Sequence, residues 1–238
     1  MPKSISARTF VTLIILLGLL VLVDAILSAH TVSVVRFTLY LTAASLAARM
    51  RVKLPGITGT MSVNLPLILV AAAEMNAAEA LCVAFISTFF QCLPRDKQKF
   101  NVVQTAFNCN TITLAAAAAR FIYASAPAGA VLTSPALRLA VAAAGYFLVN
   151  TIMVAMVLHL AENANFLRTW AEMFQLSFPY LVAGSCLAGL MLIVSSGAGW
   201  QAPLIILPVM FGVFASYRRF FGAMGQKARA AAGGAVHA

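Results

Sequence analysis

Long apolar stretches, separated by short polar or basic ones, divide the chain from residue 10 to residue 217. Most of them approach or exceed the ~20 residues that an α-helix needs to cross a hydrocarbon core of ~30 Å. Apolar and polar positions do not alternate as they do in β-barrel strands, so a helical bundle is the architecture that satisfies the backbone hydrogen bonds in lipid. The expected helices cover residues 10–27, 32–48, 60–73, 77–93, 100–124, 137–158, 174–195 and 200–217.

The pattern therefore predicts an all-α integral membrane protein, a bundle of about eight transmembrane helices. The third expected helix is short and contains Pro66. Residues 54–73 consequently form either a full span or a re-entrant segment, and a seven-helix arrangement is the alternative.

Composition supports a membrane protein. Hydrophobic residues make up 62% of the chain and charged residues 9%, with a mean hydropathy of +0.95, whereas soluble domains carry about 25% charged residues. The lipid bilayer is thus the expected solvent of one membrane domain, residues 1–217. The basic, Ala- and Gly-rich tail at 218–238 has a composition typical of disorder.

The net charge of +10 reflects membrane topology rather than nucleic-acid binding. Thirteen of the sixteen Lys and Arg residues lie in the N-terminus, in the tail, or in the loops after the second, fourth and sixth expected helices. Lys and Arg gather in cytoplasmic loops, so we expect both termini in the cytoplasm. Only Arg36, Arg120 and Arg138 fall near the other face.

The stretch Lys53–Gln91 is the most unusual part of the chain. Its opening, LPGITGTMS, contains Pro55, Gly56 and Gly59 and ends at Ser62. Irregular backbone at membrane depth occurs where it is buried in protein or lines a cavity. The segment either presents backbone groups to a ligand or forms a tight cytoplasmic turn.

Two carboxylates, Glu74 and Glu79, bracket the outer turn of this stretch. They either bind a cation or a basic ligand, or they are hydrated loop charges.

A polar stripe marks the fifth expected helix. Its members recur at spacings of three and four residues and fall within about one third of the helix circumference. In lipid such side chains either hydrogen-bond to neighbouring helices or line a polar cavity shared with Gly56, Gly59 and Ser62; Asn110, on the opposite side, favours the first reading. The stripe consists of Asn101, Gln104, Thr105, Asn108 and Thr111.

An intramembrane ion pair is expected between Asp24 and Arg36. They lie six residues before and after His30, so a hairpin turning at His30 places them at the same depth. A lone charge in hydrocarbon costs several kcal/mol and usually finds a partner. The pair either fixes the first helix against the second or forms the charged floor of an outward-facing pocket.

No residue set indicates catalysis, a metal or a cofactor. Cys82, Cys92, Cys109 and Cys186 show no CxxC spacing, and they predict neither a disulfide framework nor a zinc site. His30 and His159 each stand alone. We therefore expect a protein that is not an enzyme.

The run from LPGITGTMS through FNVVQTAFNCN resembles a known family. It is similar to the polytopic N-terminal input domains that precede diguanylate cyclase and HD-type phosphodiesterase domains in bacterial signalling proteins, over about residues 50–125. The Pro-Gly-x-x-Gly-Thr-x-Ser opening, the turn glutamates and the spacing of Phe100, Asn101, Phe107 and Asn108 carry the likeness. The resemblance implies a sensor in a bacterial inner membrane. Only 21 residues follow Tyr217, which is too few for an output domain.

Three functions are consistent with these features. The first is a non-catalytic sensor or small-ligand-binding module that acts through a protein partner. The second is a transporter or substrate-capture subunit for a small solute, in general outline similar to the membrane components of vitamin uptake systems. The third is a structural membrane subunit in which the polar residues only join helices.

Overall fold

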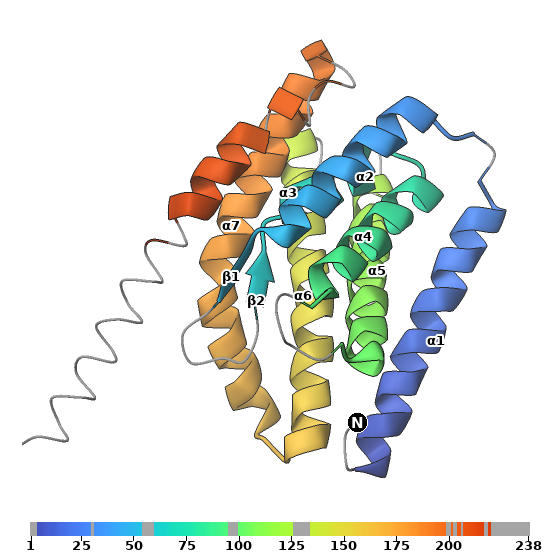
Figure 1. Ribbon diagram of the computed structural model, residues 1–238, viewed down its shortest axis with the longest axis vertical. Helices are drawn as coiled ribbons and strands as arrows, with labels where there is room; N and C mark the ends of the chain where they lie inside the picture. The colour runs from blue at the N-terminus through green and yellow to red at the C-terminus, as the bar shows by residue number, and fades with distance from the viewer. Residues whose placement is uncertain are drawn as a thin grey trace, which may run out of the picture.

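The computed structural model describes residues 4–29, 31–53, 60–94, 100–125, 134–198, 201, 204–205, 207–216 and 219. These residues form a helical bundle with one short β-hairpin (Figure 1). The elements are α1 (Ile5–Leu27), α2 (Val34–Arg49), β1 (Arg51–Lys53), β2 (Thr60–Ser62), α3 (Leu65–Glu74), α4 (Ala77–Cys92), α5 (Val102–Ser125), α6 (Pro135–Glu162) and α7 (Phe166–Ala198). A further helix, Leu207–Ser216, is called the final helix below.

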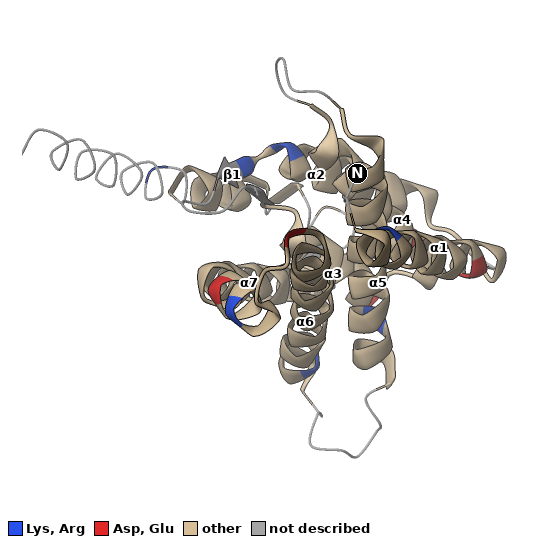
Figure 2. Ribbon diagram, turned by 90° about the horizontal axis from the view of Figure 1, so that it is seen from below, with Lys and Arg blue, Asp and Glu red and all other residues tan. Residues whose placement is uncertain are grey.

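The bundle is organised around α3. In the view from below, α3 lies at the centre of the molecule, with α5, α6 and α7 around it (Figure 2). Residues 65–72 of α3 are all buried, as is typical of a helix that is apolar on every side. The helices that pack against α3 are α2, α4, α5, α6 and α7. α3 therefore forms the centre of the bundle, although it is short.

Polar residues at the helix ends satisfy backbone groups that the helices leave free. Ser4 accepts a hydrogen bond from the Ala7 N–H at 3.1 Å, and Ser134 accepts one from the Leu137 N–H at 3.1 Å. Asn163 ends α6 in the left-handed conformation, with φ of 52°, which Asn tolerates better than most residues. Uncapped ends would be costly in an apolar medium.

Length and composition make α1, α6 and residues 166–197 of α7 able to cross a membrane, among the described residues. The prediction of a helical membrane bundle is confirmed in this coarse form. With ten residues, α3 rises about 15 Å, roughly half of a hydrocarbon core, so it does not span on its own. The expectation of about eight full spans stays a prediction.

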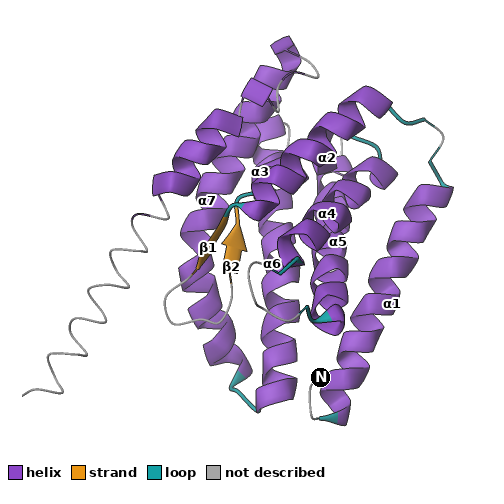
Figure 3. Ribbon diagram, in the orientation of Figure 1, coloured by secondary structure: helices purple, strands orange, loops and turns teal. Residues whose placement is uncertain are grey.

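The β-hairpin corrects the sequence analysis. β1 pairs antiparallel with β2, with Arg51 opposite Ser62 and Lys53 opposite Thr60 (Figure 3). The expected third helix, residues 60–73, therefore begins five residues later, at Leu65. Extended pairing satisfies the backbone of a stretch that adjoins Pro55, Gly56 and Gly59; these three residues lie outside the described part of the chain.

The connection between α6 and α7 is shorter than expected. The sequence predicts helices ending at Leu158 and starting at Phe174, whereas α6 extends to Glu162 and α7 begins at Phe166. Asn165 caps α7 by accepting a hydrogen bond from the Arg168 N–H at 3.1 Å. The polar residues of these two helix ends are mostly exposed. A polar stretch of this length suggests a loop, although most of it is helical here.

Close packing of α1 on α5 depends on Gly18. A Cβ atom added there would lie 2.5 Å from the Cβ of Asn110. The Asn110 side chain cannot easily yield, because its amide donates to the Ala106 carbonyl at 2.8 Å. Asn110 thus faces α1.

We predict that Gly18→Ala destabilises the protein by about 1–3 kcal/mol, because overpacking forces the two helices apart. Unfolding monitored in mixed detergent micelles measures the loss. Gly212→Ala, in the final helix, is the matched control because no atom lies within 4 Å of its added Cβ. Equal stability of the two variants would contradict this account of the α1–α5 contact.

Candidate functional site

The turn between α3 and α4 gathers charged and polar side chains of the bundle. Residues from five helices meet there, and we call this set the turn network. It consists of Arg36 and Tyr40 of α2, Glu74 of α3, Asn76 of the turn, Glu79 of α4, Arg120 of α5 and Ser195 of α7.

Glu79 joins the start of α4 to the start of α2. Its Oε2 accepts from the Asn76 N–H at 3.2 Å, and the Asn76 side chain accepts from the Glu79 N–H at 2.8 Å, which forms a capping box. The other carboxylate oxygen accepts from the Ser33 N–H, at the start of α2, at 2.8 Å. Asn76 also donates to the Thr31 carbonyl at 2.6 Å. A negative charge is favourable near these helix N-termini.

Glu74 joins α3 to α2 and α7. Its carboxylate forms an ion pair with Arg36 and accepts a hydrogen bond from the Ser195 hydroxyl. The Arg36 guanidinium carbon also lies 5.8 Å from the centroid of the Tyr40 ring, within the range of cation–π attraction. Ser195 is 121 residues from Glu74 in the chain, so only folding brings them together.

Arg120 holds the C-terminal end of α3. Its Nη1 donates to the carbonyl of Ala72 at 3.2 Å and to the carbonyl of Met75. These carbonyls belong to the last turn, where no helical N–H reaches them, and a cation is favourable at this end of the helix dipole. A carboxylate such as Glu74 is unfavourable at the negative end of α3, and Arg120 thereby offsets its charge.

The turn network has no net charge, and part of its surface is exposed. Arg36 and Arg120 contribute +2, Glu74 and Glu79 contribute −2, and the sum is zero. Glu79 is buried, but the side chains of Arg36 and Glu74 keep 31% and 19% of their surface exposed. The two turn carboxylates are therefore bound within the protein rather than being simple hydrated loop charges. The described residues contain no group of three or more His, Cys, Asp and Glu side chains placed to hold a metal.

The predicted ion pair between Asp24 and Arg36 is wrong, because Arg36 has a different partner. Arg36 pairs with Glu74, whereas Asp24 is exposed on the side of α1 that faces away from the bundle. Equal depth along two helices does not fix the direction in which each side chain points.

The members of the polar stripe of α5 lie in different surroundings. Asn101 caps the helix by accepting from the Gln104 N–H at 3.1 Å, and both residues are exposed. Asn108 donates to the Cys92 sulfur of α4 at 3.6 Å, while Thr105 and Thr111 are buried. The side chain of Ser62, like Gly56 and Gly59, lies outside the described residues, so the cavity that the stripe was expected to share stays a prediction.

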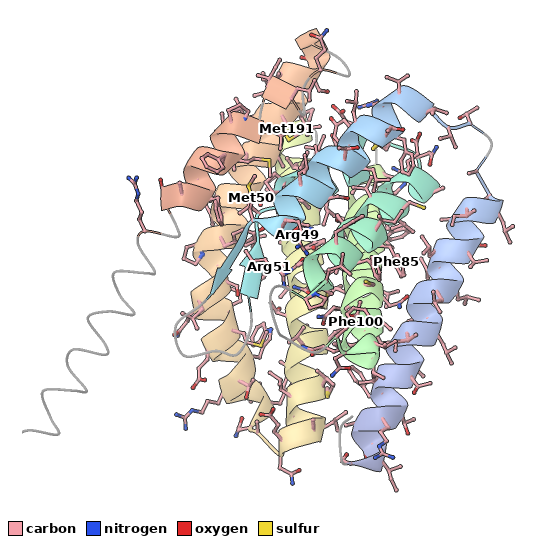
Figure 4. All side chains as sticks on the ribbon, viewed as in Figure 1. Arg49, Met50, Arg51, Phe85, Phe100 and Met191 are labelled. Carbon is pink, nitrogen blue, oxygen red and sulfur yellow. The ribbon has the colours of Figure 1, made fainter. Side chains whose placement is uncertain are left out.

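A second polar contact lies where α2 ends and β1 begins. Arg49 and Arg51 flank Met50 there (Figure 4). Arg51 donates to the Leu93 carbonyl at 2.7 Å, and Arg49 donates to the Phe90 carbonyl at 3.3 Å. These arginines hold the end of α4, just as Arg120 holds the end of α3.

Sequence reasoning missed four members of the turn network: Tyr40, Asn76, Arg120 and Ser195. Arg120 carries a usable signal, because a charge near the end of an apolar helix needs a partner inside the protein. Nothing in the pattern distinguishes Ser195 from other helical serines.

Fold and site together define an α-helical membrane protein that holds a neutral group of charges at an internal turn. The chain belongs to the MASE9 family, whose profile matches residues 7–217. MASE families are membrane-associated sensor domains found in signalling proteins, and the expected likeness to a membrane sensor is confirmed. Neither the curated proteins nor the solved structures contain a match.

We predict that Glu74→Gln costs roughly 1–3 kcal/mol of stability, between the values typical of exposed and buried ion pairs, because Arg36 loses its counter-charge. The double variant with Arg36→Gln should lose less than the sum of the two single losses, as unfolding in mixed micelles would show. Glu172→Gln is the control, because the pair of Glu172 with Arg168 is largely exposed; its loss should be below about 0.5 kcal/mol. If Glu74→Gln were as harmless, the pair would not hold α2 on α3.

Proposed function

We propose that this protein is a non-catalytic membrane sensor, which binds a small charged ligand at the turn network and acts through a protein partner. Membership of a sensor family supports the general role. The observation that carries the proposal is the Arg36–Glu74 pair, which is reachable at the surface yet tied to α2, α3 and α7. A ligand that exchanges with either charge changes the contacts of three helices at once.

The chemistry of the network also favours binding over a purely structural role. Apolar side chains of similar volume would join helices without the cost of desolvating charges. A balanced pair offers a carboxylate and a guanidinium to an incoming ligand, and each forms charge-assisted hydrogen bonds. The Ser195 hydroxyl donates to the Glu74 carboxylate. It therefore adds a third polar group to the same candidate binding surface.

Native mass spectrometry of gently extracted full-length protein tests this function. We expect a small molecule that stays bound to the wild type and to Glu172→Gln, and that is lost from folded Glu74→Gln. Retention by all three proteins, or by none, would contradict ligand binding at the turn network. Directional uptake of the retained molecule into proteoliposomes would indicate a transporter instead.

We further propose that the protein is a multi-pass protein of a bacterial inner membrane with both ends in the cytoplasm. The charge distribution supports this orientation. Two of the three arginines near the opposite face, Arg36 and Arg120, are bound to Glu74 and to the end of α3, so they are committed to the fold.

Single cysteines in a chain that lacks the four native ones test the orientation. A membrane-impermeant maleimide applied to intact spheroplasts should label Ser28→Cys, after α1, and leave Ala164→Cys, between α6 and α7, unlabelled until the membrane is opened. The reverse pattern would contradict the proposed orientation.

A further inference from the structure

The longest described helix, α7, contains a proline in its interior. Pro179 lies within the 33 residues of α7. A proline has no N–H for the carbonyl of residue 175, and its ring crowds that carbonyl, so a helix bends there. Figure 1 shows that α7 is bowed, with its lower and upper parts leaning in different directions. Pro179 therefore separates an inner half, before it, from an outer half, after it.

Interlocking aromatic contacts fasten the inner half to α6. The Trp170 indole N–H donates to the Thr151 hydroxyl at 3.2 Å. The Phe174 ring packs edge-on against Phe147 of α6, with 5.4 Å between the ring centroids, and lies 5.7 Å from the Trp170 ring. Large rings of this kind contribute both buried area and a preferred orientation.

The outer half contacts its neighbours through small residues, and it also buries the larger side chains of Leu181 and Met191. Gly184 lies against Leu65, at the start of α3, where an added Cβ would come within 2.8 Å. Gly189 faces Leu139 of α6 across an ordinary van der Waals distance of 3.8 Å from its added Cβ. Ala188 is fully buried. The small residues thus allow α3 and α6 to approach the outer half closely.

Ser195 adds a polar contact at the far end of this surface. Its hydroxyl donates to Glu74, and so the outer half of α7 is attached to the turn network. Beyond α7 the chain continues into the final helix, whose Met210 is fully buried and whose Leu207 and Phe214 pack against the core.

We propose that Pro179 is a hinge and that the Glu74–Ser195 contact sets the position of the outer half of α7 and the final helix, while the inner half stays fixed on α6. The turn network thereby controls a movable unit built into the fold. This inference goes beyond the sensor proposal, since the hinge is a property of the chain whether or not a ligand binds.

Distance measurements between pairs of spin labels on the full-length protein in lipid nanodiscs test the hinge. Spin labels replace exposed, outward-facing residues in a chain without the native cysteines. The outer pair is Ile193 with Phe121 of α5, and the inner pair is Leu167 with Val102 of α5; all four side chains are more than half exposed. In the otherwise unchanged chain we expect one distance population for each pair.

Ser195→Ala should add a second population to the outer pair and leave the inner pair unchanged. Pro179→Ala combined with Ser195→Ala should remove the second population or transfer it to both pairs, because a continuous helix moves as one body. Ser196→Ala is the matched control: its hydroxyl donates to the Ile193 carbonyl of its own helix and is exposed, so both distances should stay single.

Two results would overturn the hinge. Equal changes of the inner and outer pairs in Ser195→Ala would mean that α7 moves as a rigid rod despite Pro179. No change of either pair would mean that the contact of Ser195 with Glu74 does not set the position of the outer half. Either result leaves ligand binding, which is measured separately by mass, untouched.

Discussion

Two glutamates at the turn between α3 and α4 determine how the helices of this protein are arranged. An ionised carboxylate cannot be left without partners where water is scarce, because the cost of removing it from water is several kcal/mol. Glu79 meets this requirement with the N-terminal ends of α2 and α4, and Glu74 meets it with Arg36 and Ser195. Five helices consequently meet at one turn. The apolar surfaces of the helices drive their association, but they are much alike, and the charges select which helices become neighbours.

The short central helix explains why such a network is needed. α3 is surrounded by protein, and it packs against five other helices. Its last carbonyls are bound by Arg120, and Asn64, just before its start, donates to Ser87 of α4 at 3.3 Å. The hairpin of β1 and β2 satisfies the backbone that leads to it. Irregular chain at the centre of a membrane protein is stable only under these conditions, and charged groups placed there are typical of functional sites.

Hydrophobic periodicity located the helices of the bundle, with its largest errors at the starts of α1, α3 and α7, and it predicted their partners poorly. The expected helix at residues 77–93 agrees with α4 to within one residue, and the expected helix at 100–124 agrees with α5 to within two. Apolar runs report burial and length, which depend on local sequence. They do not report the direction in which a side chain points from its helix axis. Asp24 was therefore paired with Arg36, although Asp24 is exposed and Arg36 pairs with Glu74. Ser195 was out of reach because its role comes entirely from a contact 121 residues away.

Disulfide cross-linking in native membranes tests whether the turn network fastens α7 to α3. Cysteines would replace Leu65 of α3 and Gly184 of α7 in a chain without the native cysteines, because a Cβ atom added at Gly184 lies 3.7 Å from the Cβ of Leu65, a separation that suits a disulfide. This pair leaves both members of the Glu74–Ser195 contact in place. We predict rapid cross-linking in the otherwise unchanged chain and with Ser196→Ala, and slower cross-linking once Ser195→Ala removes the contact with Glu74. Equal rates in the three chains would contradict the role of the turn network.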